Sequence, residues 1–191
     1  MTAYQNIILS GLPGAGKSVL AKELVKIYHW ESHSVGSIFK DRWREKYPHR
    51  EVSFDQYWGN CSKEENLKID EQTRRVLEGG HIVGDFRYAI LAGGIDALQV
   101  FVTADLETRA RRYLGSDKNN LEIKETLRKR EEDEVRVGKE LYGLEYDYRE
   151  SSQYDIVLNS ARLTLEQEIG QIQRLMRQVG RAGLEPAIDT V

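Results

Sequence analysis

The chain has 191 residues, of which 40% are hydrophobic and 31% are charged, which is enough apolar material for a folded core and excludes a wholly disordered chain. Its 28 basic and 31 acidic residues give a net charge of −3, which argues against a protein that coats nucleic acid or adheres to a membrane surface. A single cysteine, Cys61, excludes an intramolecular disulfide, and without a signal peptide in residues 1–6 or an apolar run of roughly 20 residues we expect a cytoplasmic protein.

Short apolar runs alternate with amphipathic stretches along the chain. In chain order we predict a strand over 4–10, helices over 19–29 and 64–77, strands over 81–85 and 98–103, helices over 105–114 and 119–142, a strand over 154–159 and a helix over 164–179. Strands separated by helices indicate a parallel sheet covered on both faces, which is the α/β class. Residues 180–191 read as a loose tail.

The segment between the first strand and the first helix carries the strongest functional signal. Residues 11–18, GLPGAGKS, match the phosphate-binding pattern GxxxxGK[ST], with a strand before it and a helix after it. Small residues let backbone N–H groups approach an anion, the lysine reaches the β- and γ-phosphates, and the serine hydroxyl binds Mg²⁺. We assign ATP binding to six residues: Gly11, Gly14, Ala15, Gly16, Lys17 and Ser18. A glycine-rich turn without a ligand is the alternative.

Two polar residues follow the strand predicted at 81–85. Asp85 ends that strand, where an acid can hold the magnesium ion, and an ordinary turn-forming role is the alternative. Arg87 would then face the crevice at the carboxyl edge of a parallel sheet, where its guanidinium suits a second phosphate group. A surface arginine is the alternative for Arg87.

Basic residues concentrate in one stretch of the chain. Residues 109–130 carry a net charge of +5, whereas residues 131–150 carry −5. Two helices joined by a polar hinge at 115–120 suit a lid that closes over phosphates, with Arg109 and Arg112 before the hinge and Arg128 and Arg130 after it as candidate phosphate-binding arginines. The alternative is a pair of surface helices linked by salt bridges.

Several blocks of the sequence resemble archaeal-type cytidylate kinases. Residues 125–166 share the run REE-x-E, a Tyr-Gly pair and Tyr-Asp-x-Val-x-Asn-x-x-Arg with the C-terminal part of that family. Residues 34–40 look like its Ser-x-Gly-Asp-Ile-Phe-Arg segment, residues 85–89 like its Glu-Gly-Arg-Leu-Ala, and residues 106–112 like its Leu-Glu-x-Arg-Ala-x-Arg. The blocks occur in the same order and with similar spacing, so the resemblance covers about residues 4–178.

The resemblance implies a monomeric nucleoside monophosphate (NMP) kinase that transfers the γ-phosphoryl group of ATP to a monophosphate, most often CMP or dCMP, with Mg²⁺. It implies a P-loop NTPase fold of three α/β/α layers with a five-stranded parallel sheet. The kinase domain would span 1–179, with an NMP-binding segment at about 34–78 and a mobile lid at about 113–137. The residues implied for the acceptor monophosphate are Ser34, Lys40, Asp85 and Arg87, and those implied for transfer are Lys17, Arg87, Arg109, Arg112 and Arg130. Phosphoryl transfer of this kind requires no general base.

The chain departs from the family pattern at a few positions. Ser37 replaces an aspartate, Lys40 an arginine, Phe86 a glycine, and Val137-Gly138 an Arg-Tyr pair. The nearby arginines that could substitute are Arg42, Arg44 and Arg136. Two alternatives therefore stay open: a P-loop kinase for another monophosphate or a small hydroxyl compound, and a nucleotide-binding regulator without transferase activity. A nucleic-acid-dependent ATPase is disfavoured by the short, acidic chain.

An aromatic-rich segment lies between the matched blocks, from Trp43 to Trp58. Its aromatic residues could stack on a nucleobase whose edge is read by Asp70, Gln72 or Arg74, but packing of a helical subdomain is the favoured interpretation. The four histidines have no spacing that suggests catalysis or metal binding.

Overall fold

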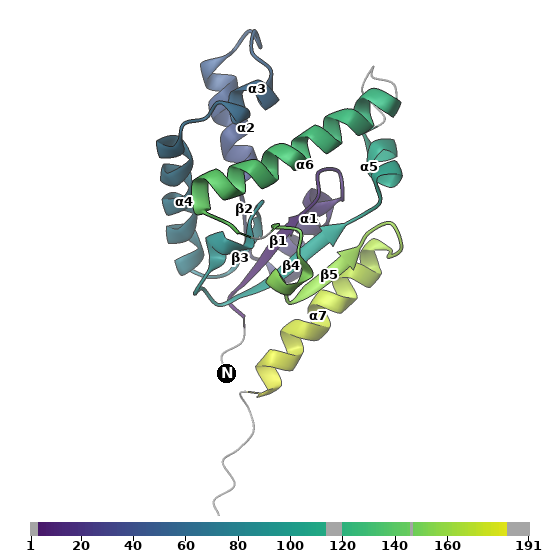
Figure 1. The fold of residues 1–191 in the computed structure, drawn as a ribbon. Coiled ribbons are helices and arrows are strands. Elements are labelled where there is room, and N and C mark those ends of the chain that lie inside the picture. Colours follow the sequence, from purple (N-terminus) through teal and green to yellow (C-terminus); the bar gives the residue numbers. More distant parts are fainter. Residues whose placement is uncertain (1–3, 114–119, 146, 183–191) are drawn as a thin grey trace, which may run out of the picture.

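The computed structural model describes residues 4–113, 120–145 and 147–182. Five parallel strands form one sheet in the order β2-β3-β1-β4-β5 (Figure 1). The strands are β1 (Asn6–Gly11), β2 (Glu31–Ser34), β3 (Ile82–Asp85), β4 (Ala97–Thr103) and β5 (Ile156–Asn159). The sheet confirms the predicted α/β class and its five parallel strands.

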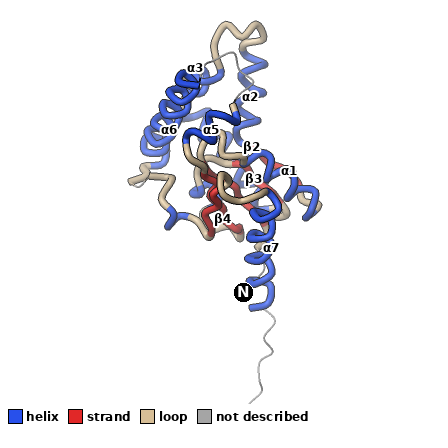
Figure 2. The backbone as a smooth tube through the Cα atoms, turned by 90° about the vertical axis from the view of Figure 1, so that its right-hand side faces the viewer, coloured by secondary structure: helices blue, strands red, loops and turns tan. Residues whose placement is uncertain are grey.

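Helices lie on both sides of the sheet. The α-helices are α1 (Lys17–Tyr28), α2 (Val35–Lys46), α3 (Phe54–Gly59), α4 (Lys63–Glu78), α5 (Leu106–Arg112), α6 (Asn120–Tyr142) and α7 (Leu165–Ala182), and two short 3₁₀ turns are η1 (Ala89–Ala92) and η2 (Ser151–Gln153). Helices α1 and α7 lie on the side of the strands away from α6 (Figure 2). Helix α6 crosses the molecule from α5 to α4 (Figure 1).

The central strand β1 is buried along its whole length because both of its faces are covered. Ile7 and Leu9 point into the core shared with α1 and α7, whereas Ile8 points into the core shared with α2, α3 and α4. All three side chains are fully buried. The sequence reads as a continuous apolar run for this reason, rather than as an alternating one.

The edge strand β2 and the two helices after it are the elements that the hydrophobic pattern did not predict. Its sequence, Glu-Ser-His-Ser, is polar and exposed or half-buried, so it gives no strand signal. The following helices begin at serine caps, Ser34 for α2 and Ser53 for α3, and Ser62 caps α4. The caps of α3 and α4 are full capping boxes, whose Ser-x-x-Gln and Ser-x-x-Glu spacing is legible in the sequence.

The strands and helices that the hydrophobic pattern did predict are confirmed, although their ends differ by a few residues. Helix α7 continues to Ala182, so the first residues of the predicted tail are helical. The rest of that tail, at 183–191, lies outside the described residues, as do Leu114 and residues 115–119 of the predicted hinge. No helix in the described parts of the chain is long and apolar enough to cross a membrane.

A glycine in β3 makes room for a buried aromatic ring. A Cβ atom on Gly84 would lie 2.7 Å from Cζ of Phe86 and 2.9 Å from Cδ1 of Ile8. Phe86 is only 1% exposed, so its ring folds back over the strand that precedes it. By contrast, a Cβ atom on Gly170 in α7 would meet no atom within 4 Å.

We expect Gly84→Ala to lower the free energy of unfolding by about 1–3 kcal/mol, because the added methyl group overpacks the core. Gly170→Ala is the matched control and should raise the free energy of unfolding by about 0.5–1 kcal/mol, because alanine favours a helix over glycine. Urea unfolding of both variants measures the two changes. A Gly84→Ala protein as stable as the wild type would contradict the packing described for Phe86.

Candidate active site

The 11–18 loop turns sharply between β1 and α1. Gly11, Gly14 and Gly16 all have positive φ angles, of 142°, 78° and 101°. A Cβ atom on Gly11 would lie 2.0 Å from the carbonyl oxygen of Val102, so only glycine allows β4 to approach there. Gly16 is the N-cap of α1, and the loop therefore presents backbone N–H groups at the start of a 12-residue helix.

Lys17 folds back over this loop. Its Nζ atom donates to the carbonyl oxygens of Gly11, at 2.8 Å, and Leu12, at 3.1 Å. Burial lowers the pKa of Lys17, and the nearby carboxylates of Asp85 and Glu134 oppose that effect. The ammonium group is thereby held at the mouth of the loop, where a phosphate would lie.

Ser18 and Asp85 meet although 67 residues separate them in the chain. The Ser18 hydroxyl donates to Oδ2 of Asp85 at 3.1 Å. Strand pairing explains the contact, because Leu9 in β1 is aligned with Asp85 in β3, and both strands end at the same edge. A hydroxyl and a carboxylate are hard oxygen ligands of the kind that Mg²⁺ prefers. The pair fits the predicted metal position.

A buried carboxylate from α6 gathers two of the predicted arginines. Glu134 is 3% exposed, and its Oε1 atom lies 3.1 Å from Nε of Arg87 and 3.3 Å from Nε of Arg130. Tyr148 donates to the other oxygen, Oε2, at 2.7 Å. Burial would raise the pKa of Glu134, but Arg87, Arg130 and the Tyr148 hydrogen bond outweigh it and hold the pKa below its ordinary value.

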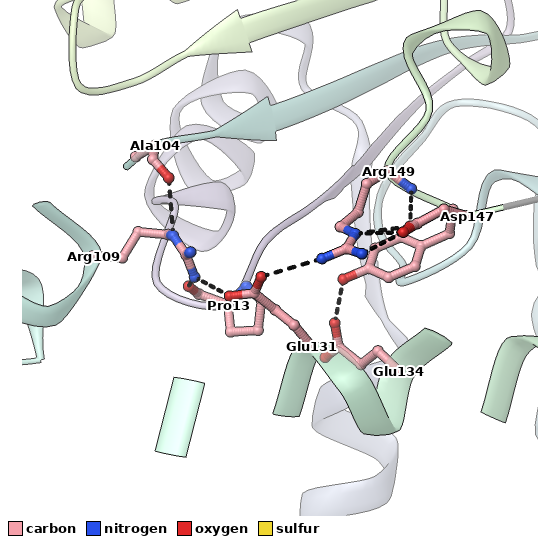
Figure 3. A network of polar contacts seen from close by, with 8 residues as sticks. Pro13, Ala104, Arg109, Glu131, Glu134, Asp147 and Arg149 are labelled. Atoms are coloured by element: carbon pink, nitrogen blue, oxygen red, sulfur yellow. Dashed lines mark hydrogen bonds and ion pairs between the residues drawn. The ribbon is translucent and has the colours of Figure 1, made fainter. Parts of the chain in front are cut away.

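A second carboxylate from α6 ties the loop to α5 (Figure 3). Glu131 Oε1 lies 2.6 Å from NH1 of Arg109, and Glu131 Oε2 lies 3.5 Å from NH1 of Arg149. Arg109 is 4% exposed and also donates to the carbonyl oxygens of Ala104, at 2.9 Å, and Pro13, at 3.2 Å. Its guanidinium group is thus directed at protein atoms beneath the loop.

Arg112 also binds backbone at the loop. Its NH1 atom donates to the carbonyl oxygen of Ala15 at 3.1 Å and to the hydroxyl of Ser160 at 2.8 Å. The Ser160 hydroxyl in turn donates to the same Ala15 carbonyl at 2.6 Å. These contacts join α5, the loop and the end of β5.

One cleft brings together most of the predicted site residues. Those that line it are Gly11, Gly14, Lys17, Ser18, Ser34, Lys40, Asp85, Arg87 and Arg130. Ala15, Gly16, Arg109 and Arg112 are not among its lining residues and lie in or behind the loop. The ATP and acceptor residues expected from separate blocks of sequence therefore share a single concave surface.

Two residues predicted to bind the acceptor, Ser34 and Lys40, lie at the end of β2 and on α2. Ser34 is aligned with Asp85 in the sheet, and its hydroxyl accepts a hydrogen bond from the backbone N–H of Ser37 at 3.3 Å. Lys40 is exposed, with its Nζ atom 6.0 Å from the centre of the Phe54 ring. Arg44, considered as a substitute, pairs with Asp41 at 2.8 Å outside the cleft lining.

The substituted positions in α6 have a packing explanation. A Cβ atom on Gly138 would lie 3.1 Å from Cε1 of Tyr88 and 3.2 Å from Cδ1 of Leu144, so glycine permits a close approach rather than a bend. Val137 lines the cleft. Arg136 forms ion pairs along α6, with Asp133 at 3.2 Å and Glu140 at 3.0 Å.

The aromatic segment divides between packing and the cleft. Trp43 donates from Nε1 to the carbonyl oxygen of Val52 at 2.8 Å and packs edge-on against Phe54. Phe54 and Trp58 line the cleft, and the guanidinium carbon of Arg87 lies 3.8 Å from the Trp58 ring centre. The segment therefore packs within the helical subdomain and also contributes aromatic rings to the cleft lining.

Of the three polar residues on α4 that were predicted to contact a nucleobase, one lines the cleft and two do not. Asp70 lines the cleft, whereas Arg74 donates to the carbonyl oxygen of Gly93 at 3.0 Å and lies outside the lining. Gln72 is likewise absent from the lining residues. His33, one of the four histidines, contacts Thr73 Oγ1 at 3.0 Å, and no group of three or more potential metal ligands exists among the described histidines, cysteines and carboxylates.

Sequence reasoning missed the two glutamates that organise the arginines. Glu131 and Glu134 belong to the acidic stretch at 131–150, which follows the basic stretch at 109–130. The available signal was the REE-x-E run, Arg130 to Glu134, whose spacing places arginine and glutamate four residues apart on one helix face. Tyr148 gave no sequence signal of its own.

The chain is similar to known proteins in sequence and in fold. Residues 7–137 match the family model described as an AAA domain. A cytidylate kinase of Methanosarcina mazei is 31% identical over 82% of this chain and 87% of its own length, and one of Methanopyrus kandleri is 29% identical over 82% and 84%. A shikimate kinase structure from Bacteroides thetaiotaomicron superposes with a TM-score of 0.57 at 14% identity, covering 92% of this chain and 99% of that one. That likeness concerns the fold alone.

We expect Glu134→Gln to destabilise the protein by about 3 kcal/mol, because it leaves two arginines without their buried counter-charge. Glu132→Gln, an exposed acid-to-amide change on the same helix, is the control and should have little effect. Denaturant unfolding at pH 7 measures both. Equal stability of the two variants would contradict the role given to Glu134.

The same pair of variants tests the lowered pKa of Glu134. A carboxylate with a pKa lower in the folded than in the unfolded state stabilises the fold above the unfolded value of about 4.3, and this stabilisation is lost as the pH falls through the folded value. The difference in stability between wild type and Glu134→Gln should therefore be constant from about pH 6 to pH 7 and shrink below about pH 4.

Proposed function

The chain belongs to the archaeal-type cytidylate kinase family, whose members carry an AAA-type P-loop domain, and from this premise we propose that it transfers the γ-phosphoryl group of ATP to CMP or dCMP. Family membership makes the protein an ATP-dependent phosphotransferase of the nucleoside monophosphate kinase type. What we propose beyond this class of enzyme is the identity of the acceptor, a cytidine nucleotide.

The single observation that supports this function best is the shared cleft. Its lining includes Lys17 and Ser18 of the phosphate-binding loop and Ser34 and Lys40 of the proposed acceptor segment. Arg87 lines the same cleft, so one bound nucleotide at each end would bring two phosphate groups together beside it. Holding both reactants in line is the main source of catalysis in this chemistry.

The proposed reaction conserves all atoms and charges. An oxygen of the acceptor monophosphate, already ionised near neutral pH, attacks the γ-phosphorus of ATP, and the bond from that phosphorus to the β–γ bridging oxygen breaks. The bridging oxygen keeps the electron pair and leaves with ADP, and the acceptor becomes a nucleoside diphosphate. We assign the neutralisation of the transferring group to Lys17, Arg87 and Arg130, which line the cleft.

Magnesium fits the residues present at the loop. We propose that Ser18 and Asp85 hold Mg²⁺, directly or through water, together with oxygens of the ATP phosphates. The ion would supply charge neutralisation for the β- and γ-phosphates. The protein's own contribution is to fix two oxygen ligands at the edge where β1 and β3 end.

Arg109 and Arg112, the other two arginines predicted to take part in transfer, contact the phosphate-binding loop and do not line the cleft. Both donate to carbonyl oxygens of the phosphate-binding loop, Arg109 to Pro13 and Arg112 to Ala15. We propose that Arg109 is a positioning residue that keeps the loop in its phosphate-binding form. Arg112, which is exposed, is the better placed of the two to contact ATP.

A panel of acceptors tests the proposal and its alternatives. ADP release should be stimulated by CMP or dCMP more than by UMP, AMP or GMP. A small hydroxyl acceptor such as shikimate, phosphorylated faster than any monophosphate, would show a P-loop kinase of another kind. ATP binding without turnover of any acceptor would favour the nucleotide-binding regulator.

We expect Lys17→Ala to lower kcat by roughly 100-fold or more, because it removes the cation that neutralises the transferring phosphoryl group. Lys22→Ala, an exposed change on the same helix, is the control and should retain full activity. Steady-state kinetics with the preferred acceptor measure both. Retained activity in Lys17→Ala would remove the loop lysine from the mechanism.

We expect Arg87→Lys to raise the acceptor KM by roughly tenfold, because a lysine keeps the positive charge beside Glu134 but loses the planar fork that grips a phosphate. The KM for ATP should stay within about twofold of the wild type if Arg87 serves the acceptor alone. Arg111→Lys on α5 is an exposed control. A change confined to the KM for ATP would place Arg87 at the donor site instead.

A further inference from the structure

A hydrogen-bonded pair of polar side chains connects α4 and α6 at the cleft. The hydroxyl of Tyr142, the last residue of α6, donates to Oδ2 of Asp70 in the middle of α4 at 2.6 Å. Both residues line the cleft, and both are half-buried. The function proposed above leaves this pair without a task, because neither residue belongs to the phosphate-binding groups.

The cleft that the pair lines is largely apolar and aromatic, and the centres of the Tyr88 and Tyr142 rings lie 5.3 Å apart. The hydrophobic lining residues of the cleft include Val35, Phe39, Phe54, Trp58, Leu91 and Val137. Asn66, one turn before Asp70 on α4, also lines the cleft, and its amide donates to the carbonyl oxygen of Ser62 at 2.9 Å. A flat ring would find apolar contact in this part of the cleft, with few polar groups to orient it.

The chemistry of a carboxylate limits what such a ring can present to it. An ionised carboxylate accepts hydrogen bonds and donates none. Burial raises the pKa of Asp70, and the Tyr142 hydrogen bond opposes that rise by stabilising the charged form. Tyr142 donates to Oδ2 and restrains the carboxyl group, so Oδ1 is the oxygen that would accept a hydrogen bond from a donor on the ligand.

We propose that Asp70, oriented by Tyr142, reads the exocyclic amino group of the acceptor base and so selects cytosine over uracil or thymine. The inference rests on the function proposed above, because it assumes that a nucleoside monophosphate occupies this end of the cleft. Cytosine presents an N4 amino donor to Asp70. Uracil and thymine present the O4 acceptor at the same place, which would leave two oxygens facing each other without a proton between them.

The direct test is the acceptor preference of Asp70→Asn. The substitution keeps the side-chain shape and supplies an amide N–H that can donate to O4. We expect the ratio of kcat/KM for CMP to that for UMP to fall by roughly 10- to 100-fold, mainly through the acceptor KM, because a polar group left unpaired in the site is costly. The KM for ATP should not change.

The matched control is Glu71→Gln, an acid-to-amide change at the neighbouring position of the same helix. Glu71 is exposed and pairs with Arg75 at 2.6 Å, and it does not line the cleft. It should leave the CMP-to-UMP ratio unchanged. Tyr142→Phe is the second variant. It should lower the CMP-to-UMP ratio of kcat/KM several-fold, because it removes the hydrogen bond that restrains the Asp70 carboxyl group. Thermal unfolding of each variant shows whether it is folded, and if Asp70→Asn is not, Tyr142→Phe decides.

The outcomes separate this inference from the proposed function. Wild-type protein that phosphorylates no monophosphate overturns both. If the wild-type protein uses CMP no better than UMP, the inference that Asp70 recognises the amino group of cytosine is overturned. The proposal of a nucleoside monophosphate kinase would still stand. A folded Asp70→Asn protein with an unchanged CMP-to-UMP ratio also overturns the inference alone.

Discussion

The carboxylate of Glu134 lies almost fully buried between Arg87, Arg130 and Tyr148. A buried charge is stable only when opposite charges and hydrogen bonds surround it, because unpaired burial of one ion costs several kcal/mol. The three partners come from the turn after β3, from α6 itself and from the segment before β5. This one group therefore ties α6 to the turn after β3 and to the segment before β5, and it holds two arginines at the cleft.

A second buried pair extends the same principle to the phosphate-binding loop. Arg109 lies under the loop and joins it to Glu131, one helical turn before Glu134. Each glutamate thus holds arginines that a ligand phosphate would also attract. Helix α6 thus supplies the counter-charges around which these arginines gather. The network also explains the charge pattern, since part of the acidic stretch after residue 130 serves as counter-charge for arginines of the basic stretch and for Arg87.

Much of the fold and part of the site could be predicted from local patterns. The glycines of the 11–18 loop were legible because their positive φ angles and close contacts require a residue without a side chain. Strands β1, β3 and β4 were legible because strands covered on both faces are largely apolar, and the edge strand β5 was legible because Ile156, Val157 and Leu158 form a continuous apolar run. Strand β2 was not, because an edge strand with polar residues such as Glu31 obtains its stability from pairing with β3 and not from its own composition. Glu134 was not legible as a site residue either, because its partners Arg87 and Tyr148 are distant in sequence.

The sequence by itself predicted a phosphate-binding loop between a strand and a helix, and its motif blocks indicated the family. Those features are local, since eight consecutive residues suffice to form the loop. Only the tertiary structure decided which charged residues face one another. Parallel strand pairing brought Asp85 beside Ser18. The long helix α6 brought Glu134 to Arg87, and Tyr142 to Asp70. Such contacts depend on how sheet and helices pack, and no spacing along the chain encodes them.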